Sequence, residues 1–207
     1  MSLWWATRLP LLSAGAAALE LDNLCVGQWM VSRPIVAGPL FGTLLGAPWE
    51  GVAFGALFEA LSCESVPAGS HVPFNGCVAV VAAVLLSAGP GDLPAAAAFP
   101  AGLAAGKLHA LAEKVLRERR AGLNALAEEA LAAGVAVPWR RIFLRSLLPH
   151  AALTATLLFG AVALGGPILG GLWDALPAAL TRGLQKAFDW SLWLGLAVLL
   201  DALRRRA

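Results

Sequence analysis

Apolar residues make up most of this chain. They form long stretches, and short polar or proline-rich segments lie between them. Residues 34–49 carry no charge, yet they are fewer than the roughly 20 residues that a straight membrane-spanning helix needs. Short apolar segments interrupted by glycine and proline are typical of the re-entrant or broken helices of transporters. Further apolar helices are expected over residues 9–31, 77–88, 94–106, 146–173 and 177–203.

The first apolar stretch begins after Arg8 and ends with the polar residues Glu20, Asp22 and Asn23. Acids are costly in hydrocarbon, so we expect these side chains at an interface or in a polar cavity. The stretch also has the outline of a secretory signal. Because the chain stays apolar long afterwards, we expect this segment to be retained as a helix.

Glycines recur at every fourth position at Gly38, Gly42 and Gly46, and Gly51 and Gly55 continue the spacing after a proline. Positions four apart share one face of a helix, so these glycines form smooth stripes that another backbone can approach closely. Simple helix packing is the interpretation that we favour for most of them. The alternative is that the stripes leave a surface for a second membrane subunit.

Residues 66–76 are not expected to form a regular helix. They contain two prolines and two glycines, with Ser70, His71 and Asn75 between them. At membrane depth, non-helical backbone is tolerated only where it is buried in protein or lines a water-filled cavity. This segment is therefore a candidate for the lining of a polar site.

Basic residues concentrate in the middle of the chain, where the segment 107–145 holds eight of the fifteen lysines and arginines. Charges alternate there with leucine and alanine at helical spacing, which indicates an amphipathic connection or helical hairpin. The positive-inside rule places this connection and the basic end 204–206 in the cytoplasm. We expect one membrane domain over residues 1–207, divided into 1–106, 107–145 and 146–207.

Composition agrees with an integral membrane protein. Hydrophobic residues make up 59% of the chain and charged residues 14%, and the mean hydropathy is +0.74. A soluble domain of this length could not bury so much apolar surface, so we expect an all-α polytopic membrane protein with transmembrane and re-entrant helices. The net charge of +2 gives no indication of nucleic-acid binding.

Cysteine and histidine positions do not suggest a metal site. The three cysteines are Cys25, Cys63 and Cys77, with no CxxC pair, and the histidines His71, His109 and His150 are scattered along the sequence. No catalytic or nucleotide-binding motif is present either. We therefore expect no catalytic residue, no metal and no cofactor.

Glu59 is the residue that stands out chemically, because it is a carboxylate within an apolar helical segment. Four neutral hydrogen-bonding residues could join it in a binding site: Gln28, Ser70, His71 and Asn75. A carboxylate among amide and hydroxyl groups suits a polyhydroxylated neutral ligand such as a sugar. The alternative is that Glu59 marks a helix end at the lipid headgroups, as we expect for Glu64, and that the others cap helices or pack in the core.

Residues 26–46, 51–59 and 66–70 resemble the IIC component of the mannose/fructose/sorbose phosphotransferase system, and weaker similarity continues at 100–106 and from 176 onward. Ala47 stands where the family usually has an acid, and Phe74 and Asn75 stand where it usually has a pair such as Pro-Asp. Family members also usually continue beyond the position of Ala207.

The resemblance implies a non-catalytic, multi-pass permease subunit of the bacterial plasma (inner) membrane that translocates sugar through the lipid bilayer. It further implies an oligomeric complex with a IID membrane subunit. Soluble IIA and IIB proteins would relay phosphate to the sugar, and the IIC subunit would have no phosphorylation site of its own.

Two other functions stay open from the sequence. One is a non-transporting scaffold or regulatory remnant that keeps only the subunit interface. The other is an unrelated secondary transporter, which would need a pair of acids to couple an ion. Glu59 and Glu64 are the candidates for that pair, but five residues of separation put them off a common helical face.

Overall fold

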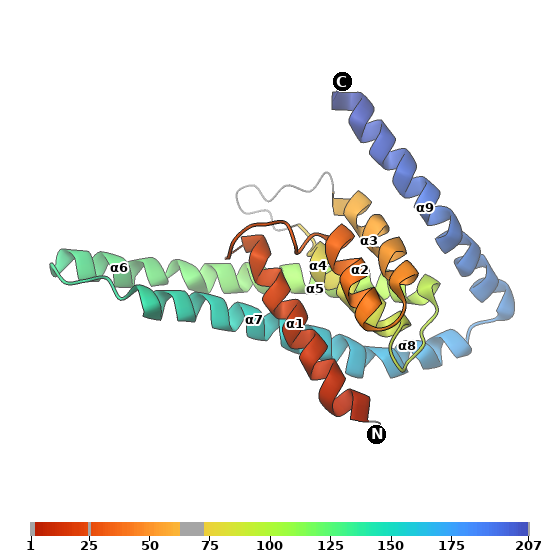
Figure 1. Ribbon diagram of the computed structural model, residues 1–207, viewed down its shortest axis with the longest axis horizontal. Coiled ribbons are helices and arrows are strands. Elements are labelled where there is room, and N and C mark those ends of the chain that lie inside the picture. Colours follow the sequence, from red (N-terminus) through yellow and green to blue (C-terminus); the bar gives the residue numbers. More distant parts are fainter. Residues whose placement is uncertain (1–2, 25, 63–72, 207) are drawn as a thin grey trace.

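The computed structural model describes residues 3–24, 26–62 and 73–206, and in these ranges it contains helices and no strand. The all-α prediction is confirmed (Figure 1). After a short π-helical segment, Trp4–Arg8, nine α-helices follow in this described part: α1 Leu9–Leu24, α2 Pro34–Leu44, α3 Pro48–Ser62, α4 Gly76–Ser87, α5 Ala95–Ala121, α6 Leu123–Ala132, α7 Trp139–Ala163, α8 Gly165–Asp174 and α9 Ala178–Arg206.

Helix α4 lies at the centre of the core. Every residue from Cys77 to Ser87 is buried, as expected for a helix that is apolar on all faces. It packs against α1, α2, α3, α5 and α7. Two glycines of α5 let the two backbones meet, because a Cβ on Gly102 would lie 2.4 Å from the carbonyl oxygen of Ala79 and one on Gly106 would lie 2.6 Å from that of Asn75.

Helices α2 and α3 form a hairpin whose contact surface is made of glycine. A Cβ on Gly38 would lie 2.3 Å from the carbonyl oxygen of Gly51, and one on Gly42 would lie 2.9 Å from the Cα of Gly51. Gly55 faces the backbone of Pro34 in the same interface. The packing prediction is therefore confirmed for these glycines. The alternative, a stripe left open for another subunit, is wrong for them because the two helices cover each other's stripes.

The basic middle of the chain forms a long helical hairpin, which is one of the two arrangements that its charge pattern predicts. Helix α5 was expected to end near residue 106 but continues to Ala121, and α7 returns alongside it (Figure 1). The residues after 106 are mainly Ala, Leu, Lys, Glu and Arg, which are strong helix formers, so the helix continues although its apolar face does not. We call the segment from Lys107 to Arg145 the arm.

One helical stretch of the described residues, Trp139–Asp174, is long and apolar enough to cross a membrane, while α2 and α4 are shorter apolar helices. Helix α9 follows and rests on the core through a few contacts. Its Phe188 ring lies 5.8 Å from that of Phe54 and 5.9 Å from that of Phe99, measured between ring centroids. The predicted bounds for this helix, 177–203, agree closely with the observed ones.

Candidate functional site

Four helix ends meet at one end of the core, which we call the polar end. They are the C-terminal ends of α1 and α3 and the N-terminal ends of α2 and α4, and ion pairs or hydrogen bonds join them. A Cβ on Gly76 at the start of α4 would lie 2.7 Å from the Pro34 ring and 2.9 Å from the Ser62 hydroxyl, so the ends are in close contact. The two predicted residues Glu59 and Asn75 both lie here.

Glu59 lies in the last turn of α3 and forms an ion pair with Arg33, the residue that precedes α2. The Nε of Arg33 donates to Oε1 at 2.7 Å, and a second guanidinium nitrogen donates to the same oxygen. The backbone N–H of Ile35 donates to Oε2 at 3.3 Å. The Glu59 side chain is 16% exposed and that of Arg33 46%, so this pair presents a charged, hydrogen-bonding surface at the edge of the core.

Gln28 lies in the exposed loop between α1 and α2, and Asp22 holds that loop in place. The Asp22 carboxylate accepts hydrogen bonds from the backbone N–H groups of Trp29 at 2.7 Å and Val31 at 2.9 Å. Gln28 has φ 53° and Met30 has φ 64°, which are left-handed conformations that cost about 1–2 kcal/mol each in a non-glycine residue. Because Asp22 stabilises these conformations, Gln28 is presented from a preformed loop.

Asn75 caps α4 and is buried. Its Oδ1 accepts from the N–H of Val78 at 3.0 Å, which fixes the orientation of the amide, and its Nδ2 donates to Glu20 at 2.8 Å. The same nitrogen lies 3.2 Å from Nδ1 of His109. Asn75 therefore links the polar end to the interior of the protein. The predicted residues Ser70 and His71 fall outside the described residues.

The carboxylate of Glu20 on α1 is the centre of a buried polar network. Besides Asn75, it accepts a hydrogen bond from Nε2 of His150 on α7, and the hydroxyl of Thr154 lies 3.5 Å away. Glu20, His109, His150 and Thr154 are all fully buried. The Asn75 amide and the His150 ring thus supply one hydrogen-bond donor to each oxygen of this buried carboxylate.

Donor-only neighbours determine where the protons of the two histidines lie. The Asn75 amide and the Arg120 guanidinium can only donate from their nitrogens, so Nδ1 of His109 and Nδ1 of His150 must accept. Each neutral ring then carries its proton on Nε2. His109 donates to Thr154 at 2.8 Å, and His150 donates to Glu20.

This proton arrangement bears on metal binding. The ligand atoms of Glu20, His109 and His150 lie within 4.8 Å of one another, a grouping that could by distance hold an ion. However, a nitrogen that carries a proton cannot ligate a metal, and each Nδ1 already accepts from a fixed donor. The positive charge of Arg120 beside His150 also opposes a cation. The geometry favours a hydrogen-bond network over a metal centre.

Comparison with known families identifies the chain. Residues 6–207 match the family model described as the sorbose-specific IIC component of the phosphotransferase system. The chain belongs to this family. It is accordingly a permease (IIC) subunit of a sugar phosphotransferase system.

Solved structures agree with the fold of this IIC chain. A structure titled "Structure of membrane protein" aligns with a TM-score of 0.74 at 17% identity, over 98% of this chain and 81% of that one. A cryo-electron microscopy structure of the mannose transporter ManYZ with microcin E492 aligns with a TM-score of 0.65 at 19% identity, over 99% of this chain and 81% of that one. No curated protein sequence matches the IIC chain significantly.

Sequence reasoning missed the buried network of the IIC chain. It treated the histidines as scattered, whereas the fold brings His109 and His150 together, with ring centroids 5.6 Å apart. Two signals were available. Glu20 is an acid within an apolar stretch, and His150 is a polar residue within the segment 146–173, and each needs a partner when buried.

Proposed function

We propose that this IIC chain translocates sugar across the bacterial inner membrane and that its polar end binds the sugar. The observation that carries the proposal is the family match over residues 6–207. The chemistry of the polar end supports it, since that end brings Glu59 together with the loop that carries Gln28.

The Arg33–Glu59 pair has the chemistry that sugar recognition needs. A sugar hydroxyl both donates and accepts, so a carboxylate oxygen beside a guanidinium can bind one or two neighbouring hydroxyls. Charge-assisted hydrogen bonds of this kind are roughly twice as strong as neutral ones. The Gln28 amide, which offers a donor and an acceptor from an exposed loop, supplies a second contact.

We propose that Asn75 contacts the sugar only by accepting a hydrogen bond at its Oδ1 atom. Both donor positions of its amide are directed at Glu20 and His109, and one lone pair of Oδ1 accepts from Val78. The second lone pair of Oδ1 is the part of this side chain that a ligand hydroxyl would use.

Phosphorylation of the sugar must come from other proteins, because the sequence contains no nucleotide-binding or phosphoryl-transfer motif. We propose a membrane complex with a IID-type subunit, supplied with phosphate by soluble IIA and IIB proteins. In this arrangement the arm and the C-terminus lie in the cytoplasm, in accord with their basic residues.

Co-expression with the IID subunit tests the proposal. We expect a complex that survives in detergent and that phosphorylates sugar only when IIA, IIB and phosphoenolpyruvate are added. A stable complex without sugar phosphorylation would favour a scaffold function instead. Sugar uptake by this chain alone, with no complex formed, would contradict the proposal.

A further inference from the structure

Three arginines at the start of α7 form no ion pair with any residue that the structure describes. Arg140, Arg141 and Arg145 are exposed, and among the described residues no carboxylate lies within ion-pairing distance of them. Elsewhere in the arm, Arg117 pairs with Glu113 at 2.7 Å. Arg141 and Arg145 are four residues apart, so they share one helix face, where like charges repel. An anion bound between them would remove this repulsion.

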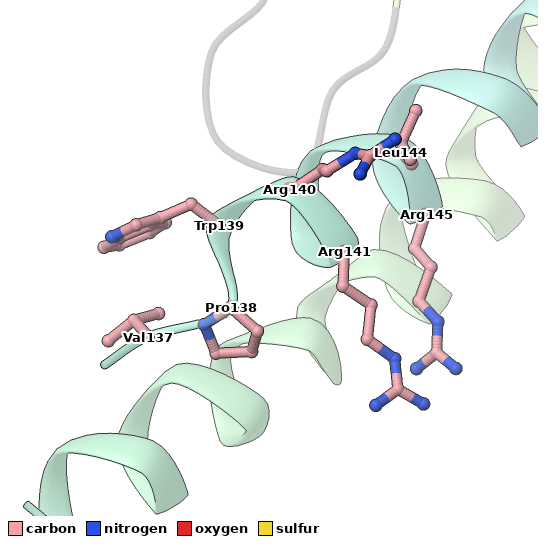
Figure 2. Close-up of a pocket in the computed structure, with 7 residues that line it drawn as sticks. All are labelled: Val137, Pro138, Trp139, Arg140, Arg141, Leu144 and Arg145. Carbon is pink, nitrogen blue, oxygen red and sulfur yellow. The ribbon is translucent and has the colours of Figure 1, made fainter. Parts of the chain in front are cut away.

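These arginines line a surface hollow of about 620 Å³ (Figure 2). The side chains of Arg141 and Arg145 extend side by side in the same direction, while the Trp139 ring lies on the other side of the helix start. Two neighbouring guanidinium groups offer several N–H donors in a planar geometry that matches phosphate oxygens. The hollow therefore suits a phosphate group.

A second hollow, of about 430 Å³, adjoins the first and shares Trp139 with it. It is lined mainly by apolar side chains, among them Ile142, Phe143 and Leu147, with Arg117 and Arg120 at its border. Leu148, one residue further, is also exposed. The start of α7 therefore has an arginine face and, on its other side, an apolar face, a combination that suits an environment with both phosphate groups and hydrocarbon chains.

The position of this surface in the fold points to the membrane as that environment. Trp139 begins the helical stretch Trp139–Asp174, which is long and apolar enough to cross a bilayer. Tryptophan and arginine in the first turns of such a helix are typical of the headgroup level. Anionic lipids of the cytoplasmic leaflet attract basic residues at this depth.

We propose that the start of α7 binds an anionic phospholipid, with Arg141 and Arg145 holding the headgroup phosphate in the hollow that Leu144 also lines. Arg140 adds charge to the same hollow. The site is separate from the polar end where we place the sugar, and it does not depend on that assignment.

Native mass spectrometry of the purified 207-residue chain in detergent tests this inference. The probes are phosphatidylglycerol, phosphatidylcholine and inorganic phosphate. The test variant is the double substitution Arg141→Gln with Arg145→Gln. The matched control is Lys114→Gln with Arg119→Gln, which removes the same charge from exposed positions of the arm that line neither hollow.

We expect phosphatidylglycerol to bind the parent chain more tightly than phosphatidylcholine, and the test variant to lose roughly thirtyfold in affinity, or about fivefold per arginine. The control should retain parental affinity. The variant Arg141→Lys with Arg145→Lys keeps the charge and should lose less than the glutamine pair.

Four outcomes would overturn the inference. The first is equal binding of both lipids, and the second is equal loss in the control and the test variant. The third is inorganic phosphate that displaces the lipid completely, which would indicate a phosphate site without a lipid chain. If an acidic soluble protein instead of lipid protected the arginines from chemical modification, the surface would be a protein-docking site and the inference would also fail.

Discussion

His150 on α7 donates its Nε2 proton to the carboxylate of Glu20 on α1, although the two residues are 130 positions apart in the chain and neither is exposed to solvent. Through Asn75, the same carboxylate is joined to the start of α4. One buried acid therefore connects the first helix, the central helix and the base of the arm.

The substitution Glu20→Gln should destabilise the protein. In the parent, Asn75 donates to one carboxylate oxygen of Glu20 and His150 donates to the other. A glutamine at this position replaces one of these oxygens with an NH₂ group. Either Asn75 or His150 would then have a buried donor without an acceptor. We expect a loss of about 2–4 kcal/mol in the free energy of unfolding, visible as a lower thermal midpoint in detergent. Glu128→Gln, at an exposed position of α6, is the control and should change little. A parental midpoint for Glu20→Gln would mean that the network contributes no stability.

Metal removal should leave the protein unchanged. Because His109 and His150 carry their protons on Nε2 and accept at Nδ1, we expect no equimolar zinc or other transition metal in the purified chain, and no shift of its thermal midpoint with a chelator. Elemental analysis and a melting curve provide the measurements. An equimolar metal that disappears in His150→Ala would refute the proton arrangement described above.

The glycine interface of α2 and α3 should not tolerate a methyl group. A Cβ on Gly51 would lie 2.3 Å from the carbonyl oxygen of Gly38, so Gly51→Ala must push the helices apart at a cost of roughly 1–3 kcal/mol. Gly160 in α7 has no atom within 4 Å of the same position, and Gly160→Ala should be neutral or stabilising by up to about 1 kcal/mol. Thermal midpoints in detergent compare the two. Equal changes in the thermal midpoint for the two variants would show that α2 and α3 are not packed as closely as the structure places them.

The sequence predicted the helices well where apolar length or glycine spacing decides them. The segments around α2, α4 and α9 were found because charges and prolines end each apolar stretch, and the packing of Gly38 on Gly51 follows from the spacing of four. The end of α5 was predicted too early, at residue 106, because the apolar residues end there. The polar residues that follow are also helix formers and continue the helix to Ala121.

Contacts between distant residues could be predicted far less well. Glu59 was identified as chemically important, but its partner Arg33 lies 26 positions away, just before another helix, and no periodicity relates the two. The meeting of Glu20 with His109 and His150 depends on how α1, α5 and α7 cross. Tertiary packing determines how these helices cross, and the residue pattern within any one helix gives no information about that crossing.

The orientation of the arm can be measured directly. A cysteine placed at Glu128, in a background without Cys25, Cys63 and Cys77, should resist an impermeant thiol reagent in intact cells and react after lysis, since the basic arm is expected in the cytoplasm. Labelling of intact cells would reverse the proposed topology. It would also place the three arginines of α7 at the opposite leaflet.

The sugar affinity of the complex with the IID subunit shows whether the polar end binds sugar through Glu59. Glu59→Gln keeps the volume of the side chain but removes its charge, so we expect sugar affinity to fall about tenfold to a hundredfold while protein abundance changes little. Glu50→Gln, at the other end of α3, is the matched control and should bind sugar like the parent. Parental sugar affinity in Glu59→Gln would show that Glu59 does not bind sugar and is a helix-end residue that pairs with Arg33.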